Sequence, residues 1–120
     1  MKKILIVDDE PNIVMSLEYA FKKNNFEVFI ARDGQEALDI LEKQLPDVII
    51  LDVMMPMVDG YATLKQLKNA ERLRHCNEMF LSVQNKEKDI EKGLSLGANL
   101  YVVKPFSVKK IVDQVNELIQ

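Results

Sequence analysis

The sequence contains a single cysteine, Cys76, so it cannot form a disulfide within one chain. No second thiol stands nearby to complete a zinc site, and this cysteine usage is typical of a reducing compartment. No apolar run approaches the roughly 18 residues of a membrane span. Only four apolar residues separate Lys3 from Asp8, too few for the core of a signal peptide. We therefore expect a cytoplasmic protein.

An excess of basic charge is also absent. The 16 Lys and Arg residues are outnumbered by 19 Asp and Glu residues, which gives a formal net charge of −3 at pH 7. A chain with this balance has no general electrostatic attraction to nucleic acid or to anionic lipid. We expect that this segment neither binds nucleic acid directly nor associates with a membrane.

Glycine and proline are sparse, with four of each among 120 residues, and no low-complexity tract interrupts the chain. Hydrophobic residues make up 48% and charged residues 29%, which argues against a disordered tail, a collagen-like repeat or a coiled coil. The length suits one domain that buries most of its apolar surface, and it is too short for two. We expect a single domain over residues 1–120.

Five short apolar runs predict five β-strands. They cover residues 4–7, 26–30, 48–51, 79–81 and 100–103. Runs rich in Val, Ile and Leu are typical of parallel strands that are covered on both faces. Glu27 interrupts the second run, which fits a strand at the edge of the sheet.

The segments between these strands predict helices. The last is the clearest, because apolar residues recur at helical spacing along 108–119. Residues that favour a helix start precede four of the segments: Pro11, the capping box from Asp33 to Glu36, Asp59 with Gly60, and Ser107. Gly97 predicts the end of the fourth helix.

Strand and helix therefore alternate five times along the chain. Right-handed crossovers with helices on both faces give an α/β fold, a doubly wound parallel sheet of five strands with five helices. In such sheets ligands bind beyond the carboxyl ends of the strands. The residues that follow each strand are the candidates for function.

Polar side chains follow four of the five strands. Asp8 and Asp9 follow the first strand, Asp52 the third, Ser82 the fourth and Lys104 the fifth. Three carboxylates at close range repel one another unless a cation or protonation answers their charge. Carboxylate and carbonyl oxygens are the ligands that Mg²⁺ prefers, whereas Zn²⁺ favours His and Cys, which these strand ends lack. The pattern predicts a magnesium site, with Mn²⁺ as an alternative.

The same strand ends suggest phosphoryl chemistry. The ammonium of Lys104 and the hydroxyl of Ser82 could, with the metal, neutralise the oxygens of a phosphoryl group. A carboxylate can act as the nucleophile toward phosphorus. Asp52 ends the most hydrophobic strand and is the candidate for that attack, which leaves Asp8 and Asp9 as metal ligands.

The chain resembles the receiver domain of two-component response regulators over essentially its whole length. The resemblance rests on motifs in matching order and spacing: ILIVDDE at 4–10, DVMMP at 52–56 leading to Asp59 and Gly60, Ser82, and GA at 97–98 leading to YVVKPF at 101–106. It implies a flavodoxin-like strand order of 2-1-3-4-5. It also implies a signalling switch in which a sensor histidine kinase or a phosphotransfer protein donates a phosphoryl group to Asp52.

The resemblance further implies how the metal is held. Mg²⁺ would be bound by Asp9, Asp52 and the backbone carbonyl of Met54. Asp8 would act partly through water.

The resemblance also implies how phosphorylation is transmitted. Ser82 and Lys104 would hold the phosphoryl oxygens, and Tyr101 would be the switch aromatic that fills the space vacated when Ser82 moves inward. A cis peptide is expected between Lys104 and Pro105. The output surface would be the last two helices and the fifth strand, acting on a partner or on a C-terminal output domain outside this chain. Turnover of an external substrate is not expected.

Some positions depart from the family pattern. Val83 stands where a small residue is usual after the fourth-strand hydroxyl, and its branched side chain would narrow access to the site. Leu100, Lys110 and Gln114 replace the charged set of regulators that dimerise through salt bridges. We therefore expect a monomer or a weak dimer.

Three other functions compete with this interpretation. A receiver-like docking module that has lost phosphorylation is compatible with Val83. A small aspartyl-phosphate phosphatase would need a second acid two residues after the nucleophile, where this chain has Met54, and a substrate-specificity segment for which there is no room. A flavin or nucleotide binder would need a phosphate-binding loop after the first strand, where this chain has acids.

Overall fold

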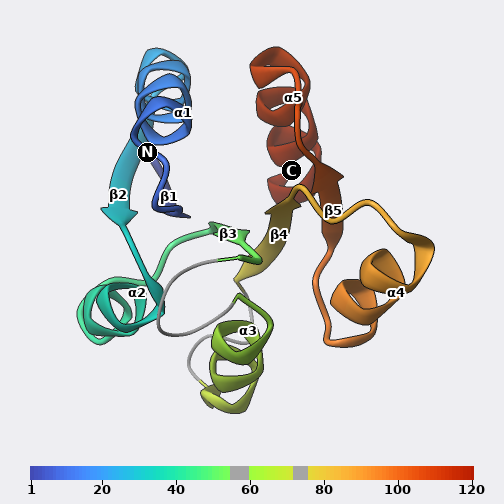
Figure 1. The fold of residues 1–120 in the computed structure, drawn as a ribbon. Helices are drawn as coiled ribbons and strands as arrows, with labels where there is room; N and C mark the ends of the chain where they lie inside the picture. The colour runs from blue at the N-terminus through green and yellow to red at the C-terminus, as the bar shows by residue number, and fades with distance from the viewer. Residues whose placement is uncertain (55–59, 72–75) are drawn as a thin grey trace.

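In the computed structural model, which describes residues 1–54, 60–71 and 76–120, strands and helices alternate along the chain (Figure 1). The elements are β1 (Lys2–Val7), α1 (Pro11–Lys23), β2 (Phe26–Ala31), α2 (Gly34–Leu41), β3 (Val48–Asp52), α3 (Gly60–Asn69), β4 (Asn77–Ser82), α4 (Glu87–Ser95), β5 (Leu100–Val103) and α5 (Val108–Ile119). All five predicted strands and the helices between them are present within these ranges. None of the described helices is long and apolar enough to cross a membrane.

The strands form one parallel sheet in the order β2-β1-β3-β4-β5, which confirms the flavodoxin-like prediction. β2, the strand with the polar interruption at Glu27, lies at an edge as expected. Helices α1 and α5 cover one face of the sheet, and α2, α3 and α4 lie on the other (Figure 1).

Alternate residues of the inner strands face two separate apolar layers, because successive side chains of a strand point to opposite faces. Ile4 and Ile6 of β1 pack with Leu17 and Phe21 of α1 on one face. On the other face, Leu5 and Val7 of β1 share a layer with the following buried residues of α2 and α3: Ala37, Leu41, Leu64 and Leu67. Two covered faces explain why these strands read as continuous apolar runs.

The predicted helix starts are confirmed where the structure describes them. Pro11 opens α1, and the Asp33 carboxylate accepts a hydrogen bond from the Glu36 N–H at 2.9 Å. Glu36 reaches back to the N–H of Arg32 at 3.0 Å, one residue before the cap. Ser107 caps α5 by accepting from the Lys110 N–H at 3.3 Å. The predicted start signal at Asp59 lies outside the described residues.

Gly97 lies just past the end of α4, as predicted. Its φ of +107° is in the region that favours glycine, and its N–H donates to the carbonyl of Leu94 at 3.0 Å. The chain therefore turns here from α4 toward β5.

Candidate functional site

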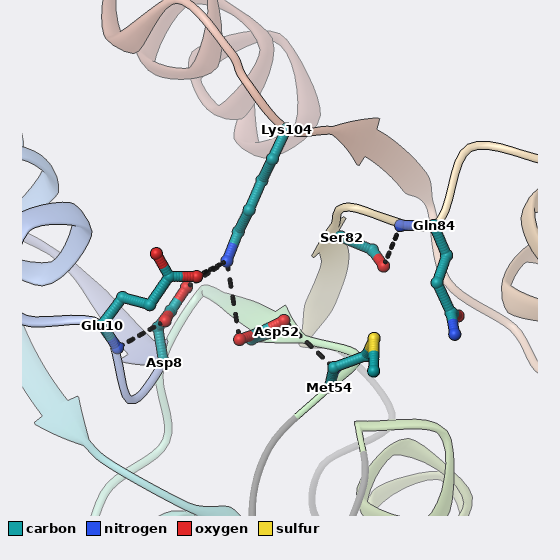
Figure 2. Close-up of polar contacts among 7 residues, drawn as sticks. All are labelled: Asp8, Glu10, Asp52, Met54, Ser82, Gln84 and Lys104. Atoms are coloured by element: carbon teal, nitrogen blue, oxygen red, sulfur yellow. Dashed lines mark hydrogen bonds and ion pairs between the residues drawn. The ribbon is translucent and has the colours of Figure 1, made fainter.

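The carboxyl ends of four strands meet at one edge of the sheet (Figure 2). The parallel register places Val7 of β1 beside Leu51 of β3, and Asp52 beside Leu81 of β4. The residues that follow or end these strands therefore share one rim. The structure brings together Asp8, Asp52 and Lys104, as the sequence predicted.

Lys104 lies at the centre of this rim. Its ammonium is 2.9 Å from a Glu10 carboxylate oxygen, 3.2 Å from an Asp8 oxygen and 3.5 Å from an Asp52 oxygen. The Lys104 side chain is only 7% exposed. Burial alone would lower the pKa of Lys104, but the hydrogen bond to Glu10 and the charges of Asp8 and Asp52 raise that pKa above its usual value. The ammonium is therefore positively charged at neutral pH.

Asp52 is the buried carboxylate at the end of β3, with 3% of the residue exposed. One of its oxygens faces Lys104, and the other accepts a hydrogen bond from the Met54 N–H at 3.1 Å. Burial first, and then repulsion from Asp8, raise the pKa of Asp52 to about 6, against the opposing pull of Lys104 and the Met54 N–H. Asp52 is thus an anion at neutral pH, but an unusually basic one for a carboxylate.

Asp8 lies at the end of β1 and is 1% exposed. One oxygen accepts from the Glu10 N–H at 2.9 Å, and the other contacts Lys104. Burial raises the pKa of Asp8, although the Glu10 N–H and Lys104 both favour its charged form. The turn that Asp8 makes with Glu10 fixes the backbone that leads into α1.

Three carboxylates of the site lie close enough together to bind one cation. Asp8, Glu10 and Asp52 each offer an oxygen, and these oxygens all lie within 4.8 Å of one another. Three carboxylates surround one ammonium, so the group keeps a net negative charge. Divalent ions that prefer oxygen ligands, such as Mg²⁺, can neutralise this charge. The donor set therefore fits a hard divalent cation.

The predicted metal ligand Asp9 is placed differently from Asp8 and Asp52. Its side chain is exposed, and it does not belong to the group of three, although its charge contributes to the raised pKa of Asp52. The third oxygen of that group belongs to Glu10. Glu10 was missed as a site residue, and its signal in the sequence was only that it is the third consecutive acid after β1.

Ser82 is fully buried at the end of β4. Its hydroxyl oxygen accepts a hydrogen bond from the Gln84 N–H at 3.0 Å, and its carbonyl accepts from the Lys104 N–H at 2.7 Å. The first contact shapes the loop between β4 and α4, and the second ties that strand end to the backbone of Lys104. Ser82 and Lys104 are therefore held on neighbouring strands of the same rim.

Tyr101 lies half-buried on the edge strand β5. Its hydroxyl donates to the carbonyl of Gln84 at 3.0 Å, so it is bonded to the loop that Ser82 begins. Its ring centroid is 6.0 Å from that of Phe80, and a Cβ placed on Gly93 of α4 would come within 2.7 Å of the Tyr101 ring. Tyr101 thus contacts both the β4–α4 loop, through its hydroxyl, and α4 at Gly93, through its ring.

Two backbone features lie next to the site. The Lys104–Pro105 peptide is cis, as expected. Gly60, the first residue of α3, approaches the backbone of Asp52 and Val53 so closely that a Cβ would lie 2.8 Å from the Val53 Cα, and its N–H donates to the Val53 carbonyl at 2.8 Å. A larger residue than glycine would not fit there without displacing the end of β3.

Val83 lies beside the site and is 60% exposed. It lines a groove of about 450 Å³ that runs from Lys104 and Glu10 along α1 to Val108 of α5. The side chain therefore flanks the approach to Lys104 from the α1 side.

The family model, the sequence relatives and the solved structures all point to the same family. The model of the response regulator receiver domain family matches residues 4–116. The alkaline phosphatase synthesis transcriptional regulatory protein PhoP of Bacillus subtilis is 40% identical over 119 residues, which cover 99% of this chain and 49% of PhoP. The chain spans about half the length of the curated relatives it matches.

Solved structures are similar over the whole chain. The receiver domain of a Francisella response regulator, 1452, has a TM-score of 0.92 at 32% identity and covers 99% of this chain and 97% of its own. The receiver domain of the sensor histidine kinase PA1611 of Pseudomonas aeruginosa PAO1 has a TM-score of 0.89 at 27% identity, with 98% and 97% of the two chains covered. That second structure has a magnesium ion coordinated in its active-site cleft.

Proposed function

This chain belongs to the receiver-domain family of two-component response regulators, and we propose that it is a phosphorylation-dependent switch whose acceptor is Asp52. The phosphoryl donor would be a sensor histidine kinase or a phosphotransfer protein. The curated relatives are transcriptional regulators about twice as long as this chain, which supports a C-terminal output domain or partner that controls transcription.

The environment of Asp52 is the observation that carries this proposal. The carboxylate is buried and yet ionised at neutral pH, because its pKa is about 6. A more basic carboxylate is a better nucleophile than an ordinary one, provided that it remains deprotonated. Lys104, 3.5 Å away, adds a buried positive charge next to the oxygen that would attack.

The transfer can be written from these groups. An Asp52 oxygen forms a bond to phosphorus as the bond from phosphorus to the donor's histidine nitrogen breaks. The electron pair of the broken bond stays on that nitrogen, which takes a proton from solvent. Lys104 would donate a hydrogen bond to one phosphoryl oxygen, and Ser82 to another, so that charge is stabilised as it develops.

Mg²⁺ is the cation proposed for the acidic group. Asp8 and Asp52 of that group would hold it together with the exposed Asp9 and the carbonyl of Met54. When bound, it supplies positive charge to the phosphoryl oxygens that one ammonium alone cannot balance. The Met54 N–H orients Asp52 by donating a hydrogen bond to one oxygen of its carboxylate.

Phosphorylation would be transmitted through Ser82 and Tyr101. A phosphoryl group adds about −1.5 to −2 charges and attracts the Ser82 hydroxyl. The Ser82 oxygen now accepts from the Gln84 N–H, and the Gln84 carbonyl accepts from Tyr101, so movement of Ser82 disturbs both contacts. The output surface would be α4, β5 and α5. A coupling of about 1–3 kcal/mol between Asp52 and this surface is typical of regulation.

The expected activity is self-modification and its reversal, without turnover of an external substrate. We further propose that the chain works in the cytoplasm, as a monomer or weak dimer, without contacting nucleic acid itself. These parts of the proposal rest on the family and on the charge balance of the sequence.

Incubation with acetyl phosphate and Mg²⁺ is expected to add one phosphoryl group to the intact mass of the chain. The label should be removed by hydroxylamine, which cleaves acyl phosphates and leaves phosphoesters of serine and tyrosine intact. Chelation of the divalent cation should prevent labelling, because three carboxylates and one ammonium leave the phosphoryl charge unbalanced. An unlabelled chain at saturating Mg²⁺, or a label that resists hydroxylamine, would contradict the proposal.

A further inference from the structure

Glu10 stands at the start of α1 but does not cap it. Residue 10 is the N-cap of α1, and its side chain makes no capping hydrogen bond. The carboxylate extends across the rim to the Lys104 ammonium instead, at 2.9 Å (Figure 2). The nearest contact of the central lysine is therefore with a residue that the proposed chemistry does not use.

The ammonium of Lys104 donates hydrogen bonds to Asp8 and Glu10, and it forms an ion pair with Asp52 at 3.5 Å. An ammonium has three N–H donors, and three carboxylates surround this one, from Asp8, Glu10 and Asp52. A phosphoryl oxygen that binds Lys104 therefore competes with these carboxylates for the N–H donors of the ammonium.

The three carboxylates differ in how easily they can move away from Lys104. The side chains of Asp8 and Asp52 are 1% and 5% exposed, whereas that of Glu10 is 55% exposed. Asp8 is also held by the Glu10 N–H, and Asp52 is the residue to be modified. A buried carboxylate that loses its partner is left as an unpaired charge away from water, which is unfavourable in free energy. The exposed Glu10 side chain can instead rotate into solvent with little loss of free energy.

We propose that Glu10 is a releasable latch that occupies Lys104 in the unmodified chain and slows its phosphorylation. The proposal rests on the function proposed above. When a phosphoryl group arrives, the hydrogen bond from Lys104 to the Glu10 oxygen breaks, and one from Lys104 to a phosphoryl oxygen forms. No proton or electron is transferred in this exchange. Glu10 is then a positioning residue, which sets how available Lys104 is.

The main alternative is that Glu10 is a metal ligand, because its oxygen lies within 4.8 Å of those of Asp8 and Asp52. The two roles predict opposite effects of removing its charge. A latch slows phosphorylation, so its loss accelerates the reaction. A ligand supports the metal, so its loss weakens Mg²⁺ binding and slows the reaction.

The test compares Glu10→Gln and Glu10→Ala with the parent and with Glu87→Gln. Glu87 is an exposed acid in the first turn of α4 and makes the same change of charge outside the Lys104 contacts. Two quantities are measured: the second-order rate constant of labelling by acetyl phosphate at saturating Mg²⁺, and the affinity for Mg²⁺ alone from an NMR titration of the unmodified chain. Thermal unfolding shows whether each variant is folded.

Both Glu10 variants are expected to label about three- to tenfold faster than the parent, with Glu10→Ala at least as fast as Glu10→Gln because an amide can still accept from Lys104. Their affinity for Mg²⁺ should change by less than about threefold. Glu87→Gln should label at the parental rate. A role in folding alone would lower the rate and the unfolding midpoint together.

Rates equal to the parent's would overturn the latch. A drop in Mg²⁺ affinity of about tenfold or more, with slower labelling, would replace it by the metal-ligand role. Failure of the function proposed above looks different, because the parent itself would then take up no phosphoryl group.

Discussion

Asp52→Asn is expected to abolish labelling by acetyl phosphate and, at pH 7 without divalent cations, to make the fold more stable by about 1–3 kcal/mol. The gain arises because the pKa of Asp52 is raised from 3.8 to about 6 by burial and by Asp8, so ionisation in the folded state is costly. Asparagine occupies nearly the same volume without the charge. Loss of the Lys104 contact offsets part of the gain.

The pH dependence follows from the direction of this shift. An acid whose pKa is higher in the folded state binds its proton more tightly there, so its contribution to stability is most favourable below about pH 4. That contribution declines as the pH rises from about 4 to 6 and is constant above about 6, where both states are ionised. The difference between Asp52→Asn and the parent should therefore be small near pH 4 and reach its full size above pH 6.

Urea unfolding between about pH 4 and pH 8 measures this difference. Asp39→Asn, which makes the same change at an exposed position of α2, should leave the stability unchanged throughout. Addition of Mg²⁺ should stabilise the parent and have much less effect on Asp52→Asn. A variant that is less stable than the parent at pH 7 would show that the site does not store the unfavourable charge described here.

Lys104→Met is expected to lower the rate of labelling by acetyl phosphate by about 10²–10³-fold, the usual effect of removing one donor that stabilises developing charge. The same variant should bind Mg²⁺ more tightly, because three carboxylates that now face one ammonium would face none. Slower labelling together with a higher affinity for Mg²⁺ would show that Lys104 acts on the phosphoryl group. If Lys104 only assembled the site, both the rate and the affinity would fall.

Labelling kinetics and a Mg²⁺ titration provide both numbers. Lys110→Met, at an exposed position of α5, is the matched control and should behave as the parent in both. Labelling that is unaffected in Lys104→Met, or Mg²⁺ affinity that falls with the rate, would remove Lys104 from the proposed chemistry.

The convergence of Asp8, Asp52 and Lys104 was predictable from sequence for a physical reason. Inner parallel strands are buried on both faces, so they appear as uninterrupted apolar runs whose ends are easy to place. Parallel strands also bring all their carboxyl ends to one edge. The sequence alone therefore predicts that the residue after each apolar run lies at the site.

The contacts among the site side chains were not predictable in the same way. Whether Asp9 or Glu10 faces Lys104 depends on the turn after β1, which is set when an Asp8 oxygen accepts the Glu10 N–H. The fourth strand was predicted to begin at residue 79, whereas β4 begins at Asn77. The strand therefore includes Glu78, a charged residue that is 1% exposed and contacts Lys68 at 2.9 Å. Burial raises the pKa of Glu78, and the hydrogen bond from Lys68 lowers it only in part.

The central claim, that Asp52 accepts the phosphoryl group, is tested most directly by locating the label. Borohydride reduces an aspartyl phosphate to homoserine, and peptide mass spectrometry of the reduced chain then identifies the modified position. We predict homoserine at position 52 only in the chain treated with acetyl phosphate and Mg²⁺. Homoserine at position 8 or 9, or none in a chain that carries the phosphoryl mass, would contradict the account.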